Sequence, residues 1–198
     1  MRKISAHYIF GVNENPVKFG VISLNGKEVV SISQPVERLA ETAQTEFYPG
    51  IIIPAIVNVA TTNERIWLPQ SDAAIEEQLK VMANIPSYAV VTTENICNLS
   101  EESLQNLMQK GTKLVLGSVT DNHPVILFRL MSKLSDKLSE LSFSEIVEIA
   151  TKNGANALNQ PLRGSINPSK QPGIWHISGF NFAKMSIDQN SKMTVLID

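Results

Sequence analysis

The polar residues best placed to do chemistry form the tripeptide Asp121-Asn122-His123, directly before Pro124. Proline suits the first position of a helix, so the tripeptide is expected at a helix amino terminus. An amino terminus with such side chains can bind a small anion. The alternative is that these side chains only cap the helix, and the known preference of such residues for caps favours it.

A second polar stretch, residues 60–64, follows the apolar run Ile51–Val59 and ends at Glu64, and Asn58 lies within the run just before its end. Residues 60–63 contain no strong metal ligand and no nucleophile beside a base. Glu64 can hydrogen-bond a ligand, and an exposed loop carboxylate is the alternative. The sequence therefore offers binding groups here but no set of catalytic groups.

The remaining reactive side chains favour structural roles. Cys97 precedes a predicted helix but has no histidine beside it in the sequence, which favours an inert, small apolar role. Ser118 lacks the glycine spacing of a nucleophile elbow. Trp175 and His176 lie in a predicted strand, where core packing of the tryptophan is favoured over stacking on a ligand.

Composition excludes several classes of protein. The 198 residues carry 17 basic and 19 acidic side chains, a formal net charge of -2. This balance provides no excess of positive charge with which to bind nucleic acid or a membrane surface. A single cysteine excludes an internal disulfide and fits a reducing compartment. With no signal-peptide pattern and no apolar stretch long enough for a bilayer, the sequence predicts a soluble, cytoplasmic protein.

We expect the buried run Ile51–Val59 to organise the elements that position these residues. The Pro49-Gly50 pair before it is typical of a turn. A continuous apolar run after a turn indicates a strand covered on both faces, as at the centre of a parallel sheet. Residues just past the carboxyl end of such a strand stand where open α/β sheets and α/β barrels place active sites.

The rest of the chain predicts strand-rich ends around a middle in which strands and helices alternate. Period-two patterns and an Asn25-Gly26 hairpin signal indicate antiparallel strands over 4–10, 17–24 and 27–33. Caps and apolar stripes predict helices over 71–83, 100–111, 124–134 and 142–153, the last ending at Asn153-Gly154. Further strands are predicted over 88–93, 113–117, 173–178 and 193–198. The alternation in the middle favours a parallel sheet.

Four stretches resemble the amidohydrolase superfamily, in its cytosine deaminase-like and imidazolonepropionase-like branch. They are 4–10 with 19–26 for the first hairpin, 48–58 for the first barrel strand, 114–123 for the last barrel strand, and 163–170 for the closing Gly-Ser-Ile-x-Pro-Gly-Lys turn. The resemblance implies a small β-sandwich, made from both chain ends, beside a (β/α)8 barrel that binds a metal.

The metal site that the resemblance implies is missing from this sequence. The two histidines of the family's His-x-His motif fall on Ala60 and Thr62, and the last-strand aspartate falls on Val119, two residues before Asp121. A methyl group and a hydroxyl cannot replace two imidazoles as ligands. We therefore predict no metal and no other cofactor.

Length leaves no room for most of an eight-stranded barrel, because residues 64–113 hold about two helices and one strand. The expected fold class is α/β. It combines a small β-sandwich from both termini (1–50 and 160–198) with an open parallel α/β sheet (51–159) that is a remnant of a (β/α)8 barrel. Open sheet edges must be covered, which favours a homodimer.

The predicted function is that of a degenerate, catalytically inactive amidohydrolase-like protein that binds a small molecule or another protein. Its expected ligand-binding residues are Asn58, Glu64, Asp121, Asn122 and His123. The runner-up is a metal-dependent hydrolase of non-peptide carbon–nitrogen bonds that rebuilds a site from Glu64, Asp121 and His123, at a dimer interface. A third hypothesis is a structural partner of a full-length paralogue, with no small-molecule site.

Overall fold

The computed structural model describes residues 1–12, 15–34, 44–81, 85–118 and 123–198. Its strands are β1 (Arg2–Ile9), β2 (Val17–Lys18), β3 (Val21–Asn25), β4 (Glu28–Ser33), β5 (Thr45–Pro54), β6 (Ile66–Trp67), β7 (Tyr88–Val91), β8 (Lys113–Leu116), β9 (Ile174–Ser178) and β10 (Lys192–Ile197). Its helices are α1 (Asp72–Val81), the 3-10 turn η1 (Ile96–Asn98), α2 (Glu101–Gln109), α3 (Pro124–Lys137), α4 (Phe143–Glu148), the π-helical turn η2 (Ile149–Asn153) and α5 (Gly154–Ala157).

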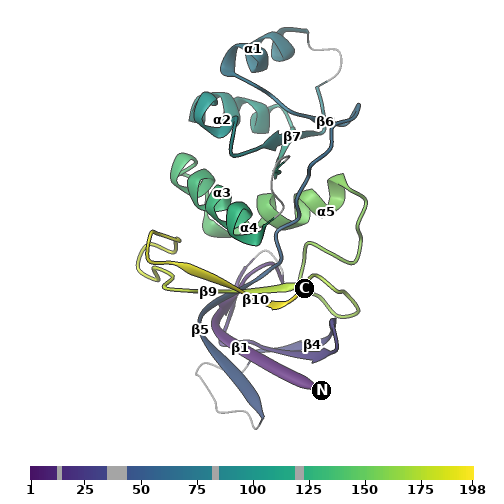
Figure 1. Cartoon of the computed structure of the whole chain (residues 1–198), viewed down its shortest axis with the longest axis vertical. Helices are drawn as coiled ribbons and strands as arrows, with labels where there is room; N and C mark the ends of the chain where they lie inside the picture. Colours follow the sequence, from purple (N-terminus) through teal and green to yellow (C-terminus); the bar gives the residue numbers. More distant parts are fainter. Residues whose placement is uncertain (13–14, 35–43, 82–84, 119–122) are drawn as a thin grey trace.

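These elements form three regions along an elongated molecule. Figure 1 shows the sheet that contains β1, β5, β9 and β10 at one end, and β6 and β7 with α1 and α2 at the other. Helices α3, α4 and α5 lie between the two sheets. In the described parts of the chain, no helix combines the length and the apolar character that crossing a membrane requires.

The terminal sheet has seven strands, in the order β10-β9-β5-β1-β3-β4, with β2 paired to β1. Only the β1–β5 pair is parallel. The predicted strands at both chain ends are confirmed, and so is the hairpin at Gly26, which has φ 59. Hydrogen bonding joins all seven strands into one sheet, so a two-sheet sandwich is not confirmed.

The apolar run after Gly50 belongs to this terminal sheet, and the prediction that it is a central strand of the parallel α/β sheet is wrong. β5 pairs with β1 and β9 and ends at Pro54. Burial on both faces is confirmed, because Ile51 and Ile53 pack in the helical core while Ile52 packs on the opposite face. An apolar run of this kind indicates that other elements cover both faces of the strand. It does not indicate which strands pair with it on either side.

Pro49 and Gly50 form a bulge, and the predicted turn is wrong. Ala6 pairs with Tyr48 and Tyr8 pairs with Ile51, so two residues of β5 stand opposite His7 alone. The Gly50 N–H donates to His7 Nδ1 at 3.0 Å. Glycine suits this position because φ is 129 and a Cβ would overlap the carbonyl oxygen of Ile177.

The second sheet is parallel, with strand order β6-β7-β8. α2 connects β7 to β8, as predicted from the alternation. α1 connects β6 to β7, and β6 is a two-residue strand that the sequence pattern does not predict. One face of the sheet contributes Ile66, Val90 and Val115 to a small buried cluster with Val59. Three parallel strands are therefore present, whereas their origin as a barrel remnant is not confirmed. The predicted end of α1 near residue 83 lies outside the described residues.

Helix starts were predicted better than helix ends. Ser100 caps α2, and Ser142 and Glu145 form the expected capping box of α4. The predicted stop at Gly154 is wrong, because the helix continues through η2 into α5 and Gly154 keeps helical φ -62. A Cβ at Gly154 would lie 2.9 Å from the Val57 carbonyl oxygen, so this glycine allows a close approach and does not end the helix.

An exposed ionic cluster joins β1 to β5 near the end of the terminal sheet. Arg2 donates from Nε and Nη2 to the two carboxylate oxygens of Glu46, each at 2.9 Å, and the Tyr48 hydroxyl donates to Glu46 at 2.7 Å. The Arg2 guanidinium is the main cause that lowers the pKa of Glu46 to about 2, and the tyrosine hydroxyl adds to it.

Replacing Glu46 by glutamine is expected to weaken the acid dependence of stability. Because the pKa of Glu46 is lower in the folded chain, its contribution is present above the ordinary glutamate pKa and is lost as pH falls towards 2. Urea unfolding between pH 7 and pH 2.5 should therefore show a shallower loss of stability for Glu46→Gln than for the wild type. Glu28→Gln, at an exposed position on β4, is the control. Equal slopes for the wild type and Glu46→Gln would contradict the prediction.

Candidate functional site

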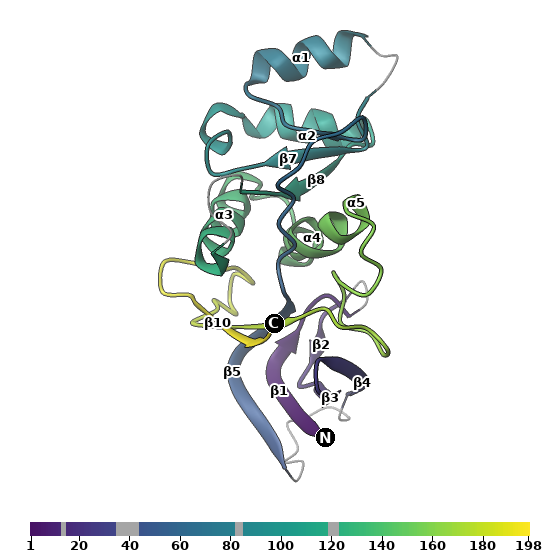
Figure 2. The same cartoon turned by 45° about the vertical axis from the view of Figure 1, so that its right-hand side comes forward.

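The segment after β5 meets the carboxyl end of β8. The Ser118 N–H donates to Asn58 Oδ1 at 2.7 Å, and Asn58 Nδ2 donates to the Ser118 carbonyl oxygen at 3.2 Å. One residue further, the Val59 N–H donates to the Leu116 carbonyl oxygen at 2.9 Å. Figure 2 shows this segment passing from β5 along the middle of the molecule towards the three-stranded sheet. Asn58 is thus a half-buried residue that holds this segment to the end of β8.

Beyond Asn58 the chain turns to the surface. Ala60, Thr62 and Glu64 are all exposed. Asn63 organises the turn that contains Glu64, because its Oδ1 accepts from the N–H groups of Arg65 and Ile66 at 2.8 and 3.0 Å. Glu64 is therefore an exposed carboxylate in a turn at the same end of the molecule as Ala60 and Thr62.

His123 caps α3, as the capping hypothesis predicted. Its Nδ1 accepts from the Val125 N–H at 3.3 Å, and Pro124 occupies the first helical position. Asp121 and Asn122 lie outside the described residues, so the predicted tripeptide is placed only through its histidine. Among the residues that the structure describes, no group of three His, Cys, Asp or Glu side chains could hold a metal ion.

No family model matches the sequence, and no curated protein matches it. Solved structures do match the fold. An amidohydrolase from Thermotoga maritima MSB8 aligns with a TM-score of 0.60 at 10% identity, over 100% of this chain and 98% of that one. An enamidase described as a member of the amidohydrolase superfamily aligns with a TM-score of 0.58 at 10% identity, over 99% and 94% of the two chains. This chain has an amidohydrolase-like fold. The guanine deaminase of E. coli also aligns, with a TM-score of 0.50 at 10% identity over 89% and 88%.

The metal site that the sequence resemblance implies would need two imidazole ligands directly after the first barrel strand. The resemblance places those two histidine positions at Ala60 and Thr62. Both are exposed just past the contact between Asn58 and Ser118, so the segment that should carry two ligands carries a methyl group and a hydroxyl. Neither side chain supplies the nitrogen ligand that zinc prefers.

A cleft of about 990 Å³ lies elsewhere, between the α4–η2 helix and the loop 164–170. We call it the helix–loop cleft; its walls include Val12, Val17, Ser144, Lys152, Ser165 and Lys170. Asn58, Glu64 and His123 do not line it. The structure therefore separates the predicted ligand-binding residues that it describes from this cleft.

The loop wall of the helix–loop cleft is attached to the terminal sheet at two points. The Ile166 N–H donates to the Gly11 carbonyl oxygen at 2.8 Å, and the Ser169 N–H donates to the Val29 carbonyl oxygen at 2.8 Å. Ser169 has φ 65. The family's closing turn, which this loop resembles, has glycine at this position, and a positive φ explains that preference because glycine adopts it without strain. At Gly164 the loop packs directly against η2, where a Cβ would lie 2.8 Å from Lys152 Cα.

Sequence reasoning missed this cleft. The closing turn 163–170 was identified as a stretch of family resemblance, and Ser142-Glu145 as a capping box, but neither pattern indicates that the two stretches face each other. Cys97 is exposed, which does not fit the apolar role predicted for it, and its inertness stays a prediction. Core packing of Trp175 is confirmed at 3% exposure.

Proposed function

We propose that this chain is a non-catalytic module that binds a small molecule on an amidohydrolase-like scaffold. The observation that carries the proposal is the pair Ala60 and Thr62, exposed next to the end of β8. Metal-dependent hydrolysis needs ligands that hold the ion and leave a position for activated water. Here those two positions offer neither.

Small-molecule binding is supported by the helix–loop cleft. Its volume of about 990 Å³ lies at the upper end of the roughly 300–1,000 Å³ typical of ligand sites. Apolar side chains such as Val12 and Val17 stand there beside polar ones such as Ser144 and Ser165. This mixture is typical of sites that bury a ligand and orient it through a few polar contacts.

The proposal predicts that the purified chain holds no stoichiometric metal and does not hydrolyse cyclic amides or amidines. Elemental analysis for zinc, iron and manganese checks the first statement, and ammonia release from a substrate panel that includes guanine checks the second. A full equivalent of metal that falls in Asp121→Ala or His123→Ala, but not in Asp136→Ala at an exposed position on α3, would support the rebuilt hydrolase instead.

Homodimerisation belongs to the same proposal. β4 and β10 are the outer strands of the terminal sheet. Outer strands carry backbone groups that a second copy can pair with or cover. Light scattering is expected to give the mass of two chains. A measured mass of one chain would contradict homodimerisation. Co-purification with a full-length relative would instead support the structural-partner hypothesis.

A further inference from the structure

We propose that the helix–loop cleft binds a small molecule through an anionic group, a carboxylate or a phosphate, held by the ammonium group of Lys170. This inference rests on the proposed small-molecule function and specifies its ligand. Three features carry it: the fixed position of the ammonium group, the distribution of charge in the cleft, and the apolar surface beside it.

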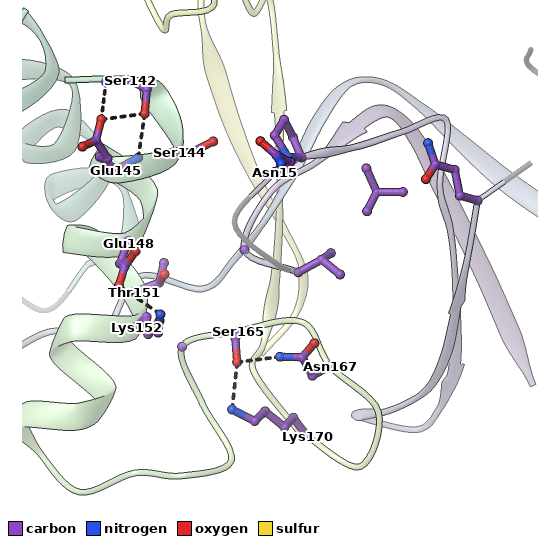
Figure 3. A pocket seen from close by; sticks show the side chains of 16 residues that line it. Asn15, Ser142, Ser144, Glu145, Glu148, Thr151, Lys152, Ser165, Asn167 and Lys170 are labelled. Atoms are coloured by element: carbon purple, nitrogen blue, oxygen red, sulfur yellow. Dashed lines mark hydrogen bonds and ion pairs between the residues drawn. The ribbon is translucent and has the colours of Figure 1, made fainter. Parts of the chain in front are cut away.

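The Lys170 ammonium group is held in place by a chain of hydrogen bonds. Its Nζ donates to Ser165 Oγ at 2.8 Å. The Asn167 amide nitrogen lies 3.2 Å from Ser165 Oγ. In the exchanged amide orientation, which satisfies more partners, the amide oxygen accepts from Ser165 and the nitrogen donates to the carbonyl oxygens of Val12 and Ile166 at 3.1 Å each. An ammonium group has three protons, and this chain uses one, so two remain for an anion. Figure 3 shows Lys170, Ser165 and Asn167 together on the loop side of the cleft.

Among the residues that the structure describes, Lys170 has no carboxylate partner. In the described part of the chain, no Asp or Glu oxygen lies within 4.0 Å of its Nζ. Lys170 is half-buried, and a cation that is partly removed from water gains more from an anion than an exposed cation does.

The carboxylates among the described lining residues, Glu145 and Glu148, belong to the helix wall and already have partners. Glu145 accepts from the Ser142 N–H and hydroxyl at 2.8 and 2.7 Å in the capping box. Glu148 pairs with Lys152 at 3.0 Å, and both side chains are about half exposed. Exposed pairs of this kind are weak, so Lys152 can turn from Glu148 to an incoming anion at little cost. In Figure 3 the capping box lies far from Lys170, while Lys152 lies on the Ser165 side of the helix wall.

The apolar part of the cleft accommodates the body of the ligand. Val12, Pro16 and Val17 line it, and they come from the segment between β1 and β3. In the exchanged orientation of its amide, Asn167 also donates to the Val12 carbonyl oxygen, which connects the apolar wall to the residues around the ammonium group. A ligand with a short apolar part and one anionic end would use both.

The test titrates inorganic phosphate and, separately, succinate into the full chain labelled with nitrogen-15, with sodium chloride at matched ionic strength as the reference. Both anions, or one of them, are expected to shift the backbone amide signals of residues 164–170 and 148–152 with saturable binding. Lys170→Met should weaken this binding by about tenfold or more, because a charge-assisted hydrogen bond is lost. Lys184→Met removes the same charge at an exposed position outside the cleft and should leave it unchanged.

Lys170→Arg keeps the charge and should retain binding, which separates loss of the cation from loss of folding. Stronger binding of phosphate or of succinate decides which anionic group the site prefers. Shifts that sodium chloride reproduces, or equal affinity in the wild type and Lys170→Met, would overturn the anion site. Such a result would leave the non-catalytic function standing, because the metal and hydrolysis assays test that separately.

Discussion

Replacing Phe10 by alanine is expected to lower the free energy of unfolding by about 3–5 kcal/mol, the usual cost of removing a buried aromatic ring. Phe10 is 1% exposed and follows β1 directly. Its ring meets Phe143 of α4 edge-on, with centroids 5.1 Å apart, and Phe180 with centroids 6.0 Å apart. The ring therefore packs the terminal sheet against the middle helices, and its loss leaves a cavity that neither side can fill alone.

Urea unfolding followed by circular dichroism measures this free energy, and thermal unfolding measures the matching change in melting temperature. For a chain of this size each kcal/mol lowers the melting temperature by roughly 2–4 °C, so the shift should be about 10 °C. Phe47→Ala is the matched control, because Phe47 is 38% exposed and leaves far less unfilled volume. Similar losses in the two variants would show that the Phe10 contacts do not hold the two layers together.

Gly117→Ala is expected to destabilise the chain by about 3 kcal/mol, through overpacking at the end of β8. A Cβ at this position would overlap the Val59 carbonyl oxygen and lie 2.6 Å from Val90 Cγ1. Since Val59 is joined to β8 by its own hydrogen bond, the methyl group must push the segment away and break that bond. The neighbouring contacts between Asn58 and Ser118 should loosen with it.

Thermal unfolding measures the loss for Gly117→Ala, and Gly26→Ala serves as the control. Gly26 has φ 59 but open space around it, so alanine there costs only the backbone strain of about 1–2 kcal/mol. A smaller loss at Gly117 than at Gly26 would mean that the segment after β5 moves aside freely.

Local signals predicted the elements well, because each depends on neighbouring residues. The hairpin at Gly26, the cap at Ser100 and the capping box at Ser142 follow from backbone requirements that a few side chains satisfy. Signals with two physical meanings failed. Proline followed by glycine suits a turn or a bulge, and at Pro49-Gly50 the pairing with β1 selects the bulge. Glycine after a helical pattern suits a cap or a close approach, and at Gly154 the nearby Val57 selects the approach.

The candidate site was harder to predict than the fold. Comparison with the family pattern located Ala60 and Thr62 by counting residues from Asn58, because the first barrel strand and its ligands are continuous in sequence. The helix–loop cleft instead combines Lys152 and Lys170 with residues near Val12, which only the folded chain brings together. Neither lysine carries a local signal for ligand binding, since an exposed i,i+4 pair and a loop lysine are common on any surface.

The pairing of β5 with β9 has a consequence for how the chain is made. Ile52 pairs with His176, so the ribosome must synthesise nearly the whole middle of the chain before β5 gains this neighbour. Contacts between residues so distant in sequence slow folding, and the edge of β5 that will pair with β9 is prone to aggregation during the delay, even when its other edge is paired with β1. We expect nascent chains to expose 51–54 to chaperones until 174–177 has emerged.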